Sequence, residues 1–283
     1  MNPFEQNKPA GCCKRIFSRV IAALLTFAAA LFLTGCSNPA GLSSGGGSGT
    51  ETPNRKVINA KWEITDKNAR FTSIELTEAQ LYIVIERDQK FYTGKYTILE
   101  DSTVHLANFG TLHIDLSQSG DSAAVRLQLD TNVPPFNGDP QINYEFNAER
   151  AVEIDSSKNT ELLCRHWNYV RFLLNGELWE PWENPQVWED GWEFPHSEPH
   201  ITNLFSKAGT YLQTLTVDGE QTLTVLGQWR WSDENENAFY YTSWQTGAWQ
   251  TYIVNVVTLT ENSFAIEEML NDGYILITEF ELF

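Results

Sequence analysis

Short runs of alternating apolar and polar residues, or of β-branched and aromatic residues, fill most of the chain after residue 53. Alternation over about four to eight residues is typical of a half-buried β-strand, and the 3.6-residue apolar period of an amphipathic helix is nearly absent. Gly, Asn, Asp and Ser separate the runs by only a few residues, which favours hairpins and a meander. The pattern predicts an all-β body with strands at residues 73–77, 81–86, 91–98, 111–116, 123–129, 210–217, 251–259 and 274–280.

Four landmarks occur twice in the same order and indicate an internal duplication. They are an opening strand with a Trp, an aromatic strand after a turn, a Gly-X-aromatic strand and a closing strand. The matched segments are, in that order, 60–62 with 165–167, 81–82 with 210–211, 93–96 with 226–229, and 142–146 with 273–280. A polar stretch at 156–159 separates the copies, so we expect domains at residues 54–155 and 160–283.

Five segments of the second copy carry a family resemblance: the Trp167 strand, FSKAGTY (205–211), GQWRW (227–231), TLTENSFAIEE (258–268) and DGY (272–274). Together they resemble the lipocalin-like lipoprotein domains common in Bacteroidetes. The resemblance covers residues 160–283 well and 54–155 poorly. It implies two tandem small antiparallel meander β-barrels, or closely related sandwiches, and it carries no catalytic residues.

The first copy departs from this family at one turn. Glu-Ala-Gln at residues 78–80 stands where the family has an Asp/Gly pair, which argues against a ligand-holding role for this copy. At roughly 100–120 residues per copy, a filled or narrowly hollow barrel is expected, too small for a large ligand. Trp62 and Trp167 are expected to plug the barrel floors with internally bonded indole N–H groups, and Cys164 to be a buried small hydrophobe.

The N-terminal residues 1–35 read as a lipoprotein signal peptide. Basic residues precede an apolar run at 20–33, which has the order of a secretory signal and is too short to span a bilayer. The run ends in Leu-Thr-Gly-Cys, which resembles the lipobox of bacterial lipoproteins. We therefore expect residues 1–35 to be removed and Cys36 to be acylated, anchoring the protein to a membrane.

Residues 36–53 are rich in Gly and Ser and are expected to form a lipidated flexible tether. Ser37 resembles the sorting residue of outer-membrane lipoproteins, which places the protein at the bacterial outer membrane and leaves the leaflet open. Cys12 and Cys13 leave with the signal peptide and Cys36 is acylated. Only Cys164 then remains, so no intramolecular disulfide is expected.

The charge balance limits the classes of partner. With 19 Lys and Arg against 37 Asp and Glu, the formal net charge is −18. An acidic surface of this kind offers no cationic patch for phosphates, so nucleic acid is excluded as a main ligand. The apolar content of 42% is too high for a disordered chain and indicates a folded body.

Motifs of the common enzyme classes are missing from the sequence. It holds no nucleophile elbow, HExxH motif, P-loop or dinucleotide fingerprint. His196, Glu198 and His200 lie close together, but a zinc site needs three or four convergent ligands and a supporting second shell. We therefore expect a non-catalytic protein with no metal and no cofactor.

An insertion at residues 175–199, between the first and second strands of the second copy, contains four Trp residues, seven acids and four prolines. Prolines prevent regular ladder pairing, so a long loop is predicted. Loops longer than about 12–15 residues in compact domains are usually functional or disordered. The candidate ligand-binding residues are those of this loop and of a later predicted hairpin: Trp179, Trp182, Trp188, Trp192, Trp244 and Trp249.

Two interpretations of this aromatic loop stay open. In one, flat Trp faces stack on the rings of a neutral glycan, or dock on a partner protein, while carboxylates accept hydrogen bonds. In the other, the Trp side chains fold back as a lid over the barrel mouth. The hairpin Trp residues likewise either extend the aromatic surface or pack across strands.

The sequence thus predicts a membrane-anchored envelope lipoprotein that acts as a non-catalytic ligand-binding or interaction module, with the loop of the second domain as its site. A structural partner of an envelope protein complex is one alternative. A carrier of a small apolar molecule inside the second barrel is another.

Overall fold

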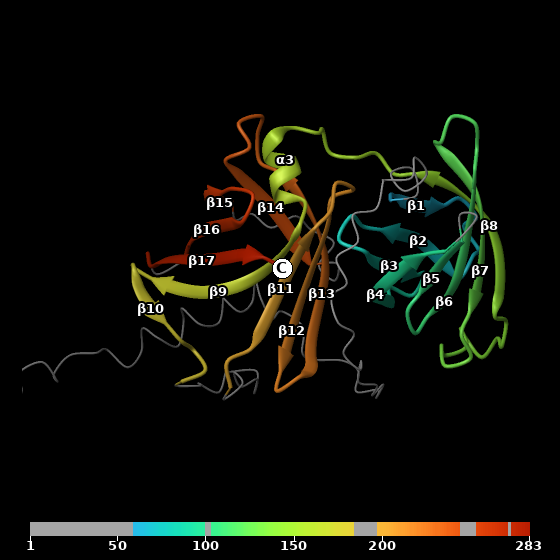
Figure 1. The fold of residues 1–283 in the computed structure, drawn as a ribbon, viewed down its shortest axis with the longest axis horizontal. Helices are drawn as coiled ribbons and strands as arrows, with labels where there is room; N and C mark the ends of the chain where they lie inside the picture. The colour runs from blue at the N-terminus through green and yellow to red at the C-terminus, as the bar shows by residue number, and fades with distance from the viewer. Residues whose placement is uncertain (1–58, 100–102, 184–196, 244–252, 271–272) are drawn as a thin grey trace, which may run out of the picture. The chain divides into compact units, whose positions relative to one another are not determined.

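The computed structural model describes residues 59–99, 103–183, 197–243, 253–270 and 273–283. The predicted signal peptide, Cys36 and the tether lie outside these residues. Four of the six candidate Trp residues also lie outside them: Trp188, Trp192, Trp244 and Trp249. The chain separates into two compact units between Ile154 and Asp155, and each contains a closed antiparallel barrel (Figure 1). The prediction of an all-β protein with two meander barrels is confirmed.

The first barrel pairs each strand with the next, and β8 returns to β1. Trp62 on β1 lies opposite Arg150 on β8 at this closing seam. Closure leaves no free strand edge for pairing with another chain. The strands are β1 (Lys61–Ile64), β2 (Phe71–Leu76), β3 (Leu81–Glu86), β4 (Phe91–Ile98), β5 (Thr103–Leu106), β6 (Gly110–Leu116), β7 (Ser122–Leu129) and β8 (Asn143–Arg150).

The second barrel closes through β9, which pairs with β17 along one edge and with β11 along the other. A short extra strand, β10, pairs further along the β11 edge of β9. The strands are β9 (His166–Leu174), β10 (Glu177–Trp179), β11 (His200–Phe205), β12 (Thr210–Val217), β13 (Glu220–Trp231), β14 (Ala238–Ser243), β15 (Val254–Leu259), β16 (Ser263–Met269) and β17 (Ile275–Leu282).

Strand β10 corrects the prediction that the whole 175–199 insertion is an irregular loop. Asn175 and Gly176 have φ of 52° and 84° and join Leu174 directly to its partner Glu177. Two central residues with positive φ are what a type I′ hairpin turn requires, and Asn-Gly is its favoured sequence. The prediction was wrong here because a proline prevents pairing only at its own position, and the first proline of the insertion is Pro181.

A short helix, α3 (Lys158–Leu163), lies at the polar stretch predicted to separate the two domains. The Ser157 side chain caps it by accepting a hydrogen bond from the backbone N–H of Thr160 at 3.0 Å. Six residues are too few to display a 3.6-residue apolar period, so the sequence pattern missed this helix. Among the described residues, no helix has the length and apolar character needed to cross a lipid bilayer.

The landmarks of the two copies occupy equivalent strands of the two barrels. Tyr82 lies opposite Gly94 across β3 and β4, and Tyr211 lies opposite Gly227 across β12 and β13. In each barrel these are the third and fourth barrel strands. A Cβ on Gly94 would approach the Tyr82 ring to 2.9 Å, so the glycine makes room for that ring.

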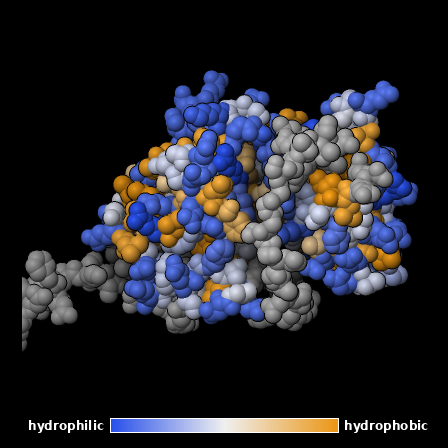
Figure 2. Space-filling model, viewed as in Figure 1, coloured by the Kyte–Doolittle hydropathy of each residue, from blue (hydrophilic) through white to orange (hydrophobic). Residues whose placement is uncertain are grey.

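The large indoles are buried, as predicted for the opening strands. Trp62 and Trp167 are 1% and 0% exposed, and the Trp167 Nε1–H donates to the carbonyl of Leu163 at 3.0 Å. Cys164 is also buried, as predicted. On the face drawn in Figure 2, hydrophilic residues lie among scattered apolar ones over both units.

The turn before β3 has no glycine at the position where the second barrel has Gly209. Gln80 adopts φ 59° where the second copy has Gly209 at φ 76°. The backbone carbonyls of these two residues accept equivalent hydrogen bonds. The Tyr96 N–H donates to the Gln80 carbonyl at 3.0 Å, and the Trp229 N–H donates to the Gly209 carbonyl at 2.8 Å. Gln80 therefore keeps the turn geometry at the cost of a left-handed backbone conformation.

We expect Gln80→Gly to raise the free energy of unfolding by about 1 kcal/mol, because glycine adopts this conformation without a Cβ clash. The Gln80 side chain is exposed, so the change removes no buried contact. Urea denaturation measures the effect. Gly209→Ala is the reciprocal control and should lower stability by a similar amount, and a loss of stability in both variants would contradict the strain at Gln80.

Candidate functional site

The interior of the second barrel holds a cavity of about 40 Å³. Eight of its fifteen lining residues are aromatic, and the polar ones sit among them. We call this space the barrel cavity. It is lined by Tyr169, Phe172, Ile201, Asn203, Phe205, Tyr211, Gln213, Phe239, Tyr241, Phe264, Ile266, Glu268, Leu276, Thr278 and Phe280.

The first barrel has a different interior. Aromatic rings meet there at short range: Phe109 lies 6.1 Å from Phe71, 5.8 Å from Tyr82 and 4.7 Å from Tyr92, measured between ring centroids. These rings belong to one continuous apolar core that includes residues from all eight strands. The first barrel is therefore packed around its own side chains.

Asn203 on β11 is the centre of a small hydrogen-bonded cluster of side chains in the barrel cavity. Its Oδ1 accepts hydrogen bonds from the Tyr211 hydroxyl at 2.9 Å and from the Gln213 Nε2 at 3.1 Å. Both donors come from β12, where strand alternation points residues 211 and 213 to the same face. Since Asn203 is 2% exposed, these bonds satisfy a buried acceptor.

Glu268 on β16 is the acidic group of the barrel cavity. The Tyr241 hydroxyl donates to its Oε1 at 3.3 Å. Burial raises the pKa of Glu268 to about 7, and the Tyr241 hydrogen bond opposes this rise only in part. Among the described lining residues there is no Lys, Arg or His to balance its charge.

The tyrosines around Glu268 stay neutral. Burial, with the nearby Glu268 charge as a further cause, raises the pKa of Tyr211 and of Tyr241 well above the usual value. Burial likewise raises the pKa of Tyr169 on β9. All three hydroxyls are therefore protonated near neutral pH, and Glu268 is the group of this set that changes charge there.

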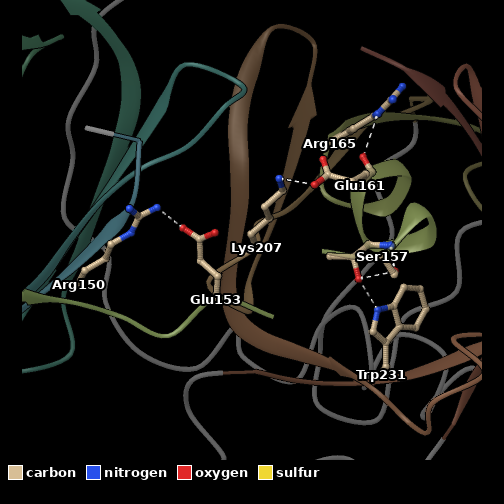
Figure 3. Close-up of polar contacts among 8 residues, drawn as sticks. Arg150, Glu153, Ser157, Glu161, Arg165, Lys207 and Trp231 are labelled. Atoms are coloured by element: carbon tan, nitrogen blue, oxygen red, sulfur yellow. Dashed lines mark hydrogen bonds and ion pairs between the residues drawn. The ribbon is translucent and has the colours of Figure 1, made fainter. Parts of the chain in front are cut away.

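One end of the second barrel is closed by α3. The Trp231 Nε1–H at the end of β13 donates to Thr160 Oγ1 at 2.9 Å. Lys207, in the β11–β12 turn, forms an ion pair with Glu161 at 2.7 Å, and Figure 3 shows these contacts side by side with the Ser157 cap. The helix is thus tied to β13 and to the β11–β12 turn.

At the opposite end, Trp182 packs against two residues that line the barrel cavity. Its ring lies 6.2 Å from that of Tyr169 and 6.5 Å from that of Phe172, between centroids, and both of these residues line the barrel cavity. Trp179 lies 5.7 Å from Phe172 and is partly buried beside it. Trp182 is 8% exposed and belongs to an apolar cluster with Phe172, Ile201, Leu215 and Leu276, so its ring face is not presented to solvent.

The structure describes two of the six predicted Trp residues, Trp179 and Trp182, and brings both against Phe172. The remaining four lie outside the described residues. Sequence reasoning missed Glu268 and Tyr241. A signal existed for Glu268, because alternation along β16 from the buried Phe264 places Ile266 and Glu268 on the inner face.

Metal ligands do not converge in the described part of the chain, where no group of three or more His, Cys, Asp or Glu side chains has the arrangement of a metal site. His200 instead lies near Phe283, with ring centroids 6.3 Å apart. The residues of the barrel cavity supply hydrogen-bond donors and acceptors and one carboxylate.

Glu268→Gln is expected to raise the free energy of unfolding at pH 8 by on the order of 2 kcal/mol and to leave it nearly unchanged near pH 4. The pKa of Glu268 rises from 4.5 to about 7 on folding, so the native state binds the extra proton between these values. The stability of the wild type therefore falls as pH rises through this window, and glutamine removes that fall. Urea denaturation at both pH values, with Glu267→Gln as control, measures it. An equal effect of Glu268→Gln at pH 4 and pH 8 would contradict the assignment.

Comparisons with known proteins give weak structural likenesses. No family model and no curated protein matches the chain. A surface lipoprotein is similar at 10% identity and a TM-score of 0.22, over 72% of this chain and 98% of its own. A mutant of transferrin-binding protein B from Actinobacillus pleuropneumoniae is similar at 8% identity and a TM-score of 0.23, over 78% of this chain and 97% of its own.

The isotype 1 transferrin-binding protein B from serogroup B Neisseria meningitidis is similar at 9% identity and a TM-score of 0.22, over 79% of this chain and 56% of its own. Identities and TM-scores this low carry no argument about function. The site has to be judged from its own residues.

Proposed function

We propose that this chain is a membrane-anchored, non-catalytic binding lipoprotein of the bacterial outer membrane, and that its ligand binds inside the second barrel. The anchor rests on the lipobox-like sequence that ends at Cys36 and on the basic and apolar residues before it. The tether that follows is rich in Gly and Ser and allows the barrels to reach away from the membrane.

The barrel cavity is the observation that carries this proposal. Small-molecule sites are concave and mostly apolar, with a few polar groups that fix orientation, and the barrel cavity has this composition. Helix α3 is bonded to one end of this barrel, and at the other end Trp182 packs against the lining residue Phe172. We keep the binding module predicted from sequence and propose the interior of the second barrel, rather than the aromatic loop, as its site.

Thermal unfolding of the full-length chain in detergent, with a library of small organic molecules, tests the proposal. A ligand that binds only the native state adds RT ln(1 + [L]/Kd) to stability, about 2.7 kcal/mol at a hundredfold excess over Kd. We expect some compounds to raise the Tm of the wild type and not that of Ile266→Phe, which fills the barrel cavity. Val257→Phe adds the same ring at an exposed position and should keep the response.

Two results would overturn the interior site. One is a library in which no compound raises the Tm of the wild type. The other is a set of compounds that raise the Tm of Ile266→Phe as much as that of the wild type. Neutral glycans belong in the library, because their binding to Ile266→Phe would return the site to the aromatic loop.

A further inference from the structure

The chemistry of the barrel cavity narrows the class of ligand, if the interior site proposed above is accepted. Glu268 is half-buried, and its one described hydrogen-bond partner is a neutral tyrosine. A buried carboxylate is usually paired with a cation, because desolvation penalises an isolated charge. The described lining offers no such cation. The place beside Glu268 is therefore suited to a positive charge supplied by a ligand.

The rest of the lining favours the same charge. The faces of aromatic rings carry negative electrostatic potential and attract cations within about 6 Å of the ring centre. Eight aromatic residues surround the barrel cavity, among them Tyr211 and Tyr241 beside Glu268. An anionic ligand would meet this lining and the Glu268 charge, and both would repel it.

The end of the barrel where Trp182 packs is acidic too. Glu180 and Glu198 lie close enough to Tyr169 to contribute to its raised pKa. The described residues around this end, 175–183 and 197–199, contain four Glu residues and neither Lys nor Arg. Acidic entrances raise the local concentration of cations and speed their association.

The volume limits the size of the bound group. A water molecule needs at least about 10–15 Å³ of such space, so the barrel cavity of about 40 Å³ holds two to four non-hydrogen atoms. An ammonium group with one to three carbons has this size. A quaternary ammonium head has five non-hydrogen atoms and exceeds the space, and a guanidinium fills it without room for the carbon that attaches it to a larger ligand.

From this geometry we infer that the barrel cavity binds the ammonium group of a primary amine, with Glu268 as its counter-ion and the surrounding aromatic rings against its carbon atoms. The amine is either a free short alkylamine or the end of a longer chain that leaves past Trp182. No covalent step is involved. The ligand is held and released unchanged.

Titration calorimetry of the full-length chain in detergent tests the inference with three probes of equal length: n-propylammonium, 1-propanol and propionate. We expect propylammonium to bind at least tenfold more tightly than propanol, and propionate not to bind. Glu268→Gln should weaken propylammonium binding at least tenfold. Glu267→Gln, the neighbouring residue on β16 that strand alternation directs outward, should leave it unchanged.

Measuring propylammonium affinity across a pH series adds a result that unfolding of a variant would not produce. The titratable groups that line the barrel cavity with Glu268 are Tyr169 on β9, Tyr211 on β12 and Tyr241 on β14, and all stay neutral. An alkylammonium keeps its proton throughout this range. Affinity should therefore fall roughly tenfold from pH 8 to pH 6 in the wild type, as Glu268 takes up a proton, and stay constant in Glu268→Gln.

The possible outcomes separate this inference from the proposed function. One outcome is that propanol binds as tightly as propylammonium, that Glu268→Gln changes neither affinity, and that the cavity-filling variants Ile266→Phe and Thr278→Leu abolish the binding of both compounds. That outcome supports the interior site and overturns the amine inference. Propylammonium binding that survives both filling variants places the amine elsewhere and also overturns the inference. Absence of saturable propylammonium binding overturns it as well, while the library screen decides the proposed function separately. Butyl- and hexylammonium then distinguish a free short amine from the end of a long one.

Discussion

Replacing Arg70 with Met is expected to lower the free energy of unfolding by about 3–5 kcal/mol. Arg70 precedes β2 in the first barrel, and its guanidinium forms an ion pair with Glu86 at 2.5 Å, with both side chains at most 3% exposed. The guanidinium also donates to the Tyr144 hydroxyl at 3.2 Å and to the Pro134 carbonyl at 2.8 Å. Without Arg70, the Glu86 carboxylate is left buried with no counter-charge.

The double variant Arg70→Met, Glu86→Met is expected to recover most of this loss, because it removes both charges from the apolar surroundings. Burial already raises the pKa of Glu86 in the wild type, against the effect of Arg70. Arg126→Met is the surface control, since the Arg126–Asp115 pair is more than half exposed and such pairs contribute about 0–1 kcal/mol. Urea denaturation at pH 7 measures all three. Equal losses in the Arg70 and Arg126 variants would contradict a structural role for the buried pair.

Trp182→Ala is expected to lower the free energy of unfolding by about 3 kcal/mol. The indole is 8% exposed and packs against Tyr169 and Phe172 over the barrel cavity, so alanine leaves a void there. Leu178→Ala is the matched control on the adjacent β10, where the side chain is 59% exposed and truncation should change stability by no more than about 0.5 kcal/mol. Thermal or urea unfolding measures both.

This variant also separates the two interpretations of the aromatic loop. If Trp182 is a lid, its removal destabilises the second barrel and speeds ligand release. If Trp182 is a stacking platform for a glycan, the variant loses glycan binding and keeps the stability of the wild type. Retained stability together with lost glycan binding would therefore contradict the placement of Trp182 over the barrel cavity.

The strands were predictable because strand structure has a period of two residues that any half-buried strand displays. The closure of the strands into two barrels was predicted from the family resemblance. The predicted bounds at 81–86, 91–98 and 210–217 match β3, β4 and β12. The paired landmarks Tyr82 with Gly94 and Tyr211 with Gly227 also fall at equivalent strand positions. Local pattern was sufficient for these features because each depends on neighbours along one or two strands.

The interior chemistry was harder to predict because it depends on which side chains meet across the barrel. Arg70 and Glu86 stand next to polar turn residues, and nothing in the local pattern marks them as buried partners sixteen positions apart. Glu268 carried a signal in the alternation of β16, but the lack of a Lys, Arg or His beside it in the described lining depends on residues from five other strands. The position of Trp182 could not be predicted, because it lies in a proline-containing segment that has no hydrophobic periodicity.

Cys164 is buried where α3 meets the second barrel, and its thiol can report whether this end of the barrel opens. It is the one cysteine among the described residues, and its backbone N–H donates to Thr160 as the helix ends. A thiol reagent reaches it only when α3 leaves the barrel, so the rate of alkylation measures the frequency of that opening. In the mature chain that we propose, with Cys36 acylated and the signal peptide removed, the reaction has a single target and needs no introduced label.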